Sequence, residues 1–227
     1  MPADRKLKVI ELGSGRGGLS RYLVTELLKL DKLESFIATN LSETENAYNL
    51  AEAKKAGIPE DKLSVIKKNF DDMGDYADGS FDLVVSNDSI IHTADPAKLM
   101  QSIARLLSAG GLVVFSDIVE GPTATREQLA DLYERYQLIN MGSAKVYDET
   151  LQACGLKKVL CETDKGEAVW RHFGLQLYSA TVTKREKLLG PDGISPEFLE
   201  YKINGLHNWL NLSMNGLIEE GWFVYTK

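Results

Sequence analysis

The sequence Val9-Ile10-Glu11-Leu12-Gly13-Ser14-Gly15-Arg16-Gly17-Gly18 joins a short apolar run to a cluster of glycines. A helical pattern, Leu19–Leu30, follows it directly. Glycine lets the backbone turn sharply and approach a ligand closely, because it carries no Cβ atom. A strand, a glycine-rich turn and a helix in this order predict a loop at the carboxyl edge of a parallel sheet, where such folds bind nucleotide-like ligands.

The alternation of strand and helix continues outward from this loop. Short apolar runs predict strands at Lys6–Leu12, Ser35–Asn40, Leu63–Lys68, Phe81–Ser86 and Leu112–Asp117. Helical patterns lie between them at Leu19–Leu30, Glu43–Ala56 and Ala97–Leu107. This alternation predicts parallel strands joined by right-handed crossovers, with helices on both faces of the sheet. We therefore expect a doubly wound, Rossmann-like α/β fold.

The second half of the chain departs from this alternation. Helices are expected at Thr125–Asn140, Tyr147–Ala153, Gly166–Leu189 and Pro196–Leu212, and strands at Leu156–Glu162 and Gly221–Thr226. A helical segment is thus inserted between the last two of seven strands. We expect a single domain over residues 1–227, with its core at 6–165 and 219–227 and the helical insertion at 166–215.

Composition narrows the class of partner. The 227 residues carry 26 Lys and Arg against 33 Asp and Glu, a formal charge of −7, and no basic run, which argues against a nucleic-acid partner. Two cysteines and three scattered histidines form neither a disulfide framework nor a zinc pattern, so no metal is expected. The charged N-terminus and the lack of about 18 consecutive apolar residues argue against a signal peptide and a membrane span. We expect a cytoplasmic protein that acts on a small molecule.

Two interpretations of the glycine-rich loop compete. Gly13, Gly15 and Gly18 satisfy the GxGxxG fingerprint of dinucleotide-binding proteins. The pattern Glu11-x-Gly13-x-Gly15-x-Gly17 instead resembles motif I of class I S-adenosylmethionine-dependent methyltransferases. A third interpretation is a glycine turn that binds no ligand. The glycines by themselves do not decide among these.

Three neighbouring features favour the methyltransferase. Glu11 suits a ligand that carries an ammonium group and would repel a pyrophosphate. The second expected strand ends at Asn40, whereas the NAD pattern calls for an acid there. After the third strand, Asn69 and Phe70 offer an amide and an aromatic ring that suit the edge and the face of adenine.

Further segments extend the resemblance over nearly the whole chain. In order and spacing they resemble sarcosine/dimethylglycine N-methyltransferases: residues 38–46, 81–92, Ser116-Asp117, Met141-Gly142-Ser143, Tyr147, Cys154-Gly155-Leu156, His172-Phe173-Gly174, Ser195-Pro196-Glu197 and Gly205-Leu206-His207-Asn208-Trp209. The resemblance implies S-adenosylmethionine as cofactor, S-adenosylhomocysteine as its product, and an antiparallel seventh strand. It also implies cofactor contacts at Glu11, Gly13, Ser14, Gly15, Asn40, Leu41, Asn69, Phe70, Ser86 and Asn87.

The chain also departs from that family. Only eight residues precede Val9, where the family usually carries a helical segment that covers the cofactor. We expect either that the chain is truncated, or that the helical insertion or a second subunit covers the cofactor instead. In the last case the protein would be a homodimer. Glu219-Glu220-Gly221 stands where Ser-Trp-Gly is frequent, and Asn87 where Gln is common. These differences affect the expected identity of the acceptor more than that of the cofactor.

Candidate catalytic residues follow the fourth expected strand. An amine acceptor is protonated near neutral pH, and His92 is a candidate to remove that proton because an imidazole titrates near pH 6.5. Asp88 is expected to face the acceptor ammonium or to hold His92. The residues expected to line the acceptor pocket are Asp117, Met141, Tyr147, His172 and Trp209. If the acceptor carries a carboxylate, Lys145 and Arg171 are the candidates to bind it.

These observations favour transfer of a methyl group to the amine of a compound like sarcosine or dimethylglycine, in betaine biosynthesis. Three alternatives stay open at this point. They are a methyltransferase for another small metabolite, a methyltransferase-like binding module without activity, and an NAD-dependent oxidoreductase.

Overall fold

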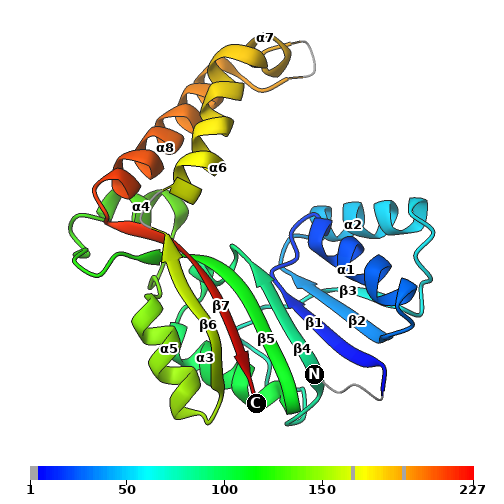
Figure 1. The fold of residues 1–227 in the computed structure, drawn as a ribbon. Helices are drawn as coiled ribbons and strands as arrows, with labels where there is room; N and C mark the ends of the chain where they lie inside the picture. The colour runs from blue at the N-terminus through cyan, green and yellow to red at the C-terminus, as the bar shows by residue number, and fades with distance from the viewer. Residues whose placement is uncertain (1–4, 165–166, 191–192) are drawn as a thin grey trace. The chain divides into compact units, whose positions relative to one another are not determined.

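Seven strands form one sheet in the computed structural model, which describes residues 5–164, 167–190 and 193–227. Their order is β3-β2-β1-β4-β5-β7-β6 (Figure 1). The bounds are β1 Leu7–Leu12, β2 Leu33–Asn40, β3 Leu63–Lys67, β4 Phe81–Asn87, β5 Leu107–Glu120, β6 Lys157–Asp164 and β7 Ile218–Thr226. The first five strands are parallel, and β7 runs against them. The expected seven-stranded fold with an antiparallel last strand is confirmed.

The direction in which successive strands are added to the sheet reverses between β1 and β4. Strand β1 pairs with β2 on one side and with β4 on the other, so that Glu11 lies opposite both Ala38 and Val85. Crossovers from β1 proceed toward β2 and β3, whereas β4 proceeds toward β5. Such a switch point leaves a crevice at the carboxyl ends of the strands, where open α/β sheets bind their ligands.

Helices cover the sheet in a pattern that the apolar residues explain. Helices α1 (Gly18–Lys29) and α2 (Glu43–Lys55) contribute Val24 and Ala53 to a cluster with Val9, Phe36 and Val85. Because successive strand residues point to opposite faces, Phe115 of β5 points away from that cluster. Its ring contacts Tyr147 of α5 (Ala144–Ala153), and α3 (Pro96–Leu106) lies against α5.

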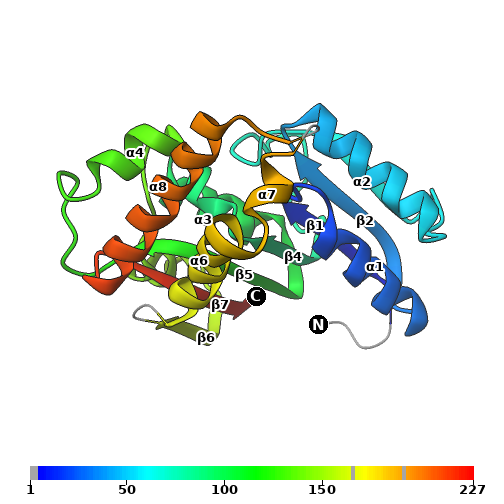
Figure 2. The same ribbon diagram turned by 90° about the horizontal axis from the view of Figure 1, so that it is seen from above.

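The chain divides into two compact units. The first, called the sheet unit, comprises residues up to Asp117 with 140–162 and 222–227. The second, the helical unit, comprises 118–139 and 163–221, and its helices are α4 (Ala130–Tyr136), α6 (Glu167–Tyr178), the π-helical turn Ser179–Thr183, α7 (Arg185–Leu188) and α8 (Pro196–Met214). Helices α6 and α8 run side by side (Figure 2). The expected insertion boundary at residues 165 and 166 lies outside the described residues, and a single domain stays a prediction.

Two expected helices differ in extent. The helix expected over Gly166–Leu189 is divided, within the described residues, into α6, the π-helical turn Ser179–Thr183 and α7. The prediction over Thr125–Asn140 is wrong, because only α4, Ala130–Tyr136, forms an α-helix there. Before it, Thr125 and Gln128 exchange hydrogen bonds that close a separate turn. After it, Gln137 has a φ of +53°, a left-handed conformation that cannot continue a right-handed helix. Sequence periodicity does not reveal either interruption.

Two further observations bear on the class of protein. Within 5–164, 167–190 and 193–227, no helix is both long and apolar enough to cross a membrane. The same residues contain no group of three His, Cys, Asp or Glu side chains that could hold a metal ion.

Candidate cofactor and active site

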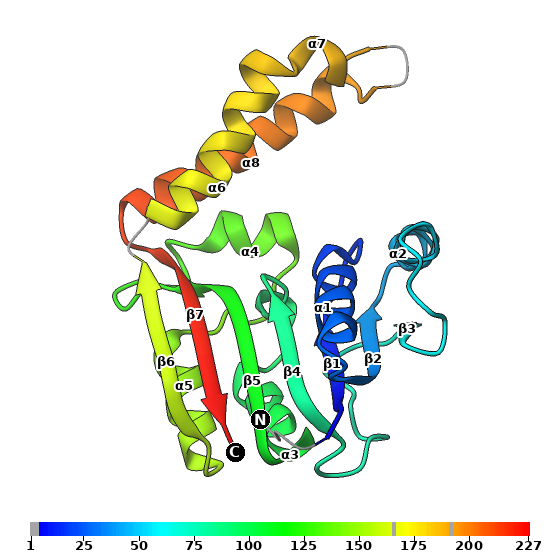
Figure 3. The same cartoon turned by 45° about the vertical axis from the view of Figure 1, so that its right-hand side comes forward.

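The glycine-rich loop adopts a conformation that only glycine takes readily. Gly13, Gly15 and Gly17 have φ values of +72°, +49° and +74°, in the left-handed region. The loop leads from β1 into α1, near the carboxyl ends of the parallel strands (Figure 3). The amide of Ser14 donates to Thr39 O over 2.8 Å, and Ser89 Oγ donates to Gly13 O over 2.8 Å. The loop is therefore held from both neighbouring strands.

A cavity of about 540 Å³ opens beside this loop. Its lining residues are Glu11, Gly13, Ser14, Gly15, Gly18, Leu19, Tyr22, Asn87 and Ser89. No atom lies within 4 Å of the position that a Cβ would take at Gly15 or Gly18, so the backbone faces open space. The buried Ser14 Oγ has no hydrogen-bond partner among the described residues. An orphaned hydroxyl and an open backbone cradle fit a polar ligand at this point.

Glu11 is a buried acid in that cavity. Its side chain is 2% exposed, and Ser20 Oγ donates a hydrogen bond to it. Burial raises its pKa from 4.5 to about 7, an effect that the Ser20 hydrogen bond and the positive charge of Arg21 oppose. A cationic ligand group would favour the ionised carboxylate and offset the cost of burying it.

The remaining predicted cofactor residues lie at the ends of β2, β3 and β4. Asn40 Nδ2 donates to Glu45 over 3.1 Å, and Leu41 beside it is exposed. Asn69 Oδ1 accepts from the amide of Asp71 over 2.9 Å, and the ring of Phe70 comes within 3.5 Å of the Cβ position of Gly13. The hydroxyl of Ser86 is buried and donates to Leu12 O over 2.8 Å. Ser86 thus ties β4 to β1 instead of facing open space.

Asp88 and His92 follow β4, as the sequence predicts. Asp88 has a φ of +49°, and its carboxylate accepts from Ser116 Oγ at 2.8 Å and from Asn87 Nδ2 at 3.1 Å. The side chain of Asp88 is exposed. His92 is exposed as well, yet surrounding protein desolvates its ring enough to lower its pKa below 6.5. Among the described residues no hydrogen bond joins its ring to Asp88, and the ring is neutral at pH 7.

Asp117 holds the turn that carries His92. It is 0% exposed, and its two carboxylate oxygens accept from the amide of Ile91 at 3.0 Å and from the hydroxyl of Tyr147 at 2.8 Å. Tyr147 is fully buried, and Met141 is buried as well. The structure therefore brings Asp117, Tyr147 and the turn Ile90–His92 together. In this state Asp117 and Tyr147 face one another and not an open pocket.

Comparison with known proteins decides among the interpretations of the loop. The model of a family described as a methyltransferase domain matches residues 10–115. The chain is 30% identical over 220 residues to the sarcosine/dimethylglycine N-methyltransferase of Halorhodospira halochloris. The aligned region covers 96% of this chain and 75% of that protein. The chain belongs to the class I S-adenosylmethionine-dependent methyltransferases. Its cofactor is S-adenosylmethionine.

Solved structures agree on the fold of this methyltransferase. A protein from Galdieria sulphuraria assigned as a sarcosine dimethylglycine methyltransferase matches with a TM-score of 0.86 at 24% identity, over 98% of this chain and 79% of that chain. A phosphoethanolamine N-methyltransferase from Haemonchus contortus, in complex with phosphomonomethylethanolamine and S-adenosylhomocysteine, matches with a TM-score of 0.84 at 19% identity, over 100% of this chain and 50% of that chain.

Two predicted acceptor residues of the methyltransferase, His172 and Trp209, belong to the helical unit. Trp209 is 6% exposed, donates from Nε1 to the hydroxyl of Tyr136 at 2.6 Å, and stacks on Phe173 with 5.0 Å between ring centroids. It is a core residue of that unit. His172 is exposed and lies 2.8 Å from Gln176 Nε2. Neither residue is in the lining of the cavity at the glycine-rich loop, which belongs to the sheet unit.

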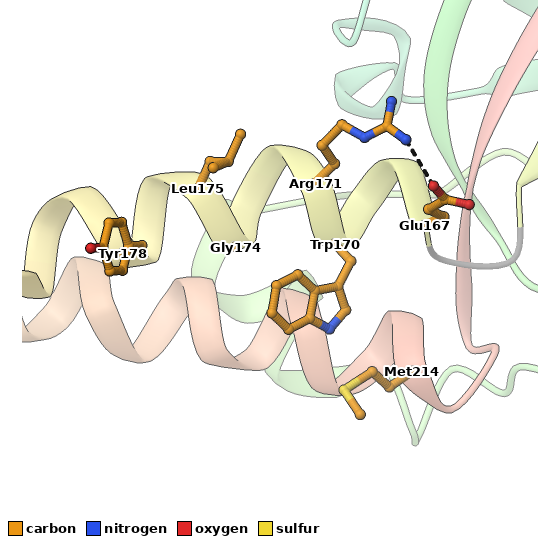
Figure 4. Close-up of a pocket in the computed structure, with 7 residues that line it drawn as sticks. All are labelled: Glu167, Trp170, Arg171, Gly174, Leu175, Tyr178 and Met214. Atoms are coloured by element: carbon orange, nitrogen blue, oxygen red, sulfur yellow. Dashed lines mark hydrogen bonds and ion pairs between the residues drawn. The ribbon is translucent and has the colours of Figure 1, made fainter.

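The helical unit has a cavity of its own, of about 700 Å³ (Figure 4). It is lined by Glu167, Trp170, Arg171, Gly174, Leu175, Tyr178 and Met214. Its charged groups are Arg171 and Glu167, which pair at 2.8 Å (Figure 4). Lys145, the other candidate cation, pairs with Glu149 at 3.8 Å. The acid in the lining of this mostly apolar cavity, Glu167, is exposed, whereas Glu11 of the cofactor site is buried.

Several residues of the site escaped sequence reasoning. Ser20, Tyr22, Ser89 and Ser116 all contact or line it. Ser89 and Ser116 lie inside segments that the resemblance already marked, so their position after β4 and near the end of β5 was a usable signal. Ser20 and Tyr22 lie on α1, where a serine or a tyrosine carries no functional signal of its own.

Proposed function

We propose that this methyltransferase methylates the amine nitrogen of a small acceptor of the sarcosine and dimethylglycine kind. The observation that carries this proposal is the exposed carboxylate of Asp88, which Ser116 and Asn87 hold beside the cofactor cavity. A fixed carboxylate attracts an ammonium group more effectively than a mobile one, because no side-chain entropy is lost on binding. The name of the Halorhodospira halochloris relative supports this choice of acceptor.

The cofactor contacts are part of the same proposal. Glu11 would bind the ammonium group of the cofactor, Asn40 its ribose hydroxyls, and Asn69 and Phe70 its adenine. Gly13, Ser14, Gly15 and Asn87 would contact it along the loop, with Leu41 beside the adenine. When bound, S-adenosylmethionine supplies a methyl group on a sulfonium centre, which a neutral amine can take up.

His92 would make the amine neutral. The lowered pKa of its imidazole keeps the ring unprotonated at pH 7, so it can accept the proton of the acceptor ammonium. Asp117 acts on His92 indirectly. It accepts a hydrogen bond from the amide of Ile91 and so fixes the turn Ile90–His92. Three further points stay predictions. They are a homodimer, a cytoplasmic location, and contacts of the acceptor with Met141, Tyr147, His172 and Trp209. A dimethylglycine acceptor would make betaine the product.

Calorimetric titration with S-adenosylhomocysteine, with NADH as control ligand, tests the cofactor site first. We expect micromolar binding of S-adenosylhomocysteine and none of NADH. A methyl-transfer screen with glycine, sarcosine, dimethylglycine and phosphoethanolamine then tests the acceptor, since the Haemonchus contortus enzyme acts in the phosphoethanolamine series. Turnover of phosphoethanolamine alone would overturn the amino-acid acceptor, and cofactor binding without any turnover would indicate a binding module.

A further inference from the structure

Asn49 of α2 fills the space that Gly17 leaves open. It is 0% exposed. A Cβ atom on Gly17 would lie 1.9 Å from Cγ of Asn49, far closer than two atoms can approach. The amide of Asn49 therefore occupies the place of a side chain at position 17. The glycine-rich loop and α2 fit together only in this combination.

Hydrogen bonds extend this contact to α1. Asn49 Oδ1 accepts from Arg21 Nη1 at 2.9 Å, and the same nitrogen donates to Arg16 O at 2.7 Å. Residues 16 and 17 are thus held between α1 and α2. Asn49 Nδ2 is buried without a partner among the described residues, which is unfavourable. A leucine would fill the space without that cost, so packing alone does not explain an asparagine here.

The same helix also holds the end of β2. Glu45 accepts from Asn40 Nδ2 at 3.1 Å, and Asn46 Nδ2 donates to Asn40 O at 3.2 Å. Side chains of one helix therefore contact both the glycine-rich loop and Asn40, two segments proposed to bind different parts of the cofactor. A shift at Asn49 would change the spacing of these segments.

We propose that Asn49 is a positioning residue for S-adenosylmethionine: its carbonyl oxygen, through Arg21, keeps the glycine-rich loop in the conformation that binds the cofactor. The proposal rests on the proposed contacts of the loop with the cofactor. Asn49 touches the loop and Arg21, and it takes no part in proton or methyl transfer.

The test compares Asn49→Leu with Asn49→Asp, which keeps an oxygen acceptor for Arg21. Binding of S-adenosylhomocysteine is titrated calorimetrically at pH 8, where Glu11 is ionised, and at a temperature where circular dichroism shows each variant folded. We expect Asn49→Leu to weaken binding by about tenfold or more and Asn49→Asp by less than about threefold, because only the leucine removes the oxygen that accepts from Arg21 and ties α2 to α1. With an acceptor in hand, KM for S-adenosylmethionine should rise while kcat stays within about twofold.

A matched control separates positioning from stability. Ala53 is a buried residue of α2 that packs in the apolar cluster with Val9 and Phe36. Ala53→Gly should lower the melting temperature through its helix propensity but leave the affinity for S-adenosylhomocysteine within about twofold. Wild-type affinity in folded Asn49→Leu, or equal losses in the Leu and Asp variants, would overturn the proposal. If the wild-type chain itself does not bind, the cofactor site and not Asn49 is in error.

A double-mutant cycle completes the test. If Asn49 acts through Arg21, Arg21→Met should weaken binding as Asn49→Leu does, and the double variant should lose little more than either alone. Additive losses would contradict a shared route. Should Asn49→Leu fail to fold, Arg21→Met and Asn49→Asp still carry the comparison, and wild-type affinity in Arg21→Met would overturn the proposal.

Discussion

The cavities of the two units are built in opposite ways. In the sheet unit the cavity is formed by a left-handed glycine loop, by the buried Glu11 and Ser14 and by Ser89, whose hydroxyl donates to Gly13 O. Only Tyr22 among its large lining side chains is strongly exposed, at 63%. In the helical unit it is formed by exposed side chains of α6 and the end of α8, with Trp170, Leu175, Tyr178 and Met214 between 52% and 70% exposed. A cavity made of backbone conformation tolerates few substitutions, whereas one made of exposed side chains can change residue by residue.

Substitution of Gly17 by Ala should have the largest effect. An alanine there combines a left-handed φ of +74° with a Cβ 1.9 Å from Cγ of the buried Asn49. Backbone strain and overpacking together amount to about 4 kcal/mol, so S-adenosylhomocysteine binding should weaken by about a thousandfold or the melting temperature should fall steeply. Calorimetry and thermal unfolding measure both. An unchanged affinity in a fully stable variant would contradict the view that this cavity depends on its backbone.

Substitution of His92 by Ala separates chemistry from cofactor binding within the sheet unit. His92 is exposed and is not among the residues that line the cavity, so the affinity for S-adenosylhomocysteine should stay within about threefold. Loss of a general base should lower kcat by about a hundredfold. Steady-state kinetics on the acceptor found in the screen, beside calorimetry, check this. Unchanged turnover would remove His92 from the mechanism.

The buried acid Glu11 should make the sheet unit sensitive to pH. Its folded pKa, about 7, lies above the unfolded value of 4.5, so its proton stabilises the folded chain at low pH. That stability is lost as the pH rises through about 7, and it amounts to about 3 kcal/mol. Without ligand, the difference in unfolding free energy between wild type and Glu11→Gln should change by this order between pH 5 and 8. Urea titrations at both pH values measure it.

The same acid predicts a second pH effect. If Glu11 binds the ammonium of the cofactor, binding releases its proton and strengthens as the pH rises from 5.5 to about 7.5. In Glu11→Gln this dependence should disappear. A wild-type affinity that does not vary with pH would place the ammonium elsewhere.

The smallest effect is expected for Gly174→Ala in the helical unit. A Cβ there would lie 2.7 Å from two ring carbons of Trp170, but that ring is 52% exposed and can rotate. The better helix propensity of alanine offsets part of the cost, so unfolding free energy should change by less than about 1 kcal/mol. Affinity for S-adenosylhomocysteine should not change. A loss comparable to that of Gly17→Ala would erase the contrast between the two units.

The sequence predicts most of the sheet unit. The order of strands and helices, the glycine-rich loop and the placement of Glu11, Asn87 and Asp88 follow from short segments whose periodicity and glycines are local properties. Ser42 is a further example. Glu45 follows it by three residues, which is a capping-box spacing, and the amide of Glu45 donates to Ser42 Oγ at 3.3 Å. Prediction is weaker where a helix stops within a polar segment, as between Thr125 and Asn140.

Only the tertiary structure decides which side chains meet. The pairing of Ser20 with Glu11, of Asn49 with Gly17, and of Tyr147 with Asp117 joins separate elements. The raised pKa of Glu11 likewise depends on how much water the folded chain removes from its carboxyl group. The sequence alone determined the strand order along the chain and the ligand-binding loop, because backbone preference and apolar spacing act between near neighbours. Burial and long-range hydrogen bonds exist only once the strands have paired, so the electrostatics of the site and the residues that position it were decided by the fold.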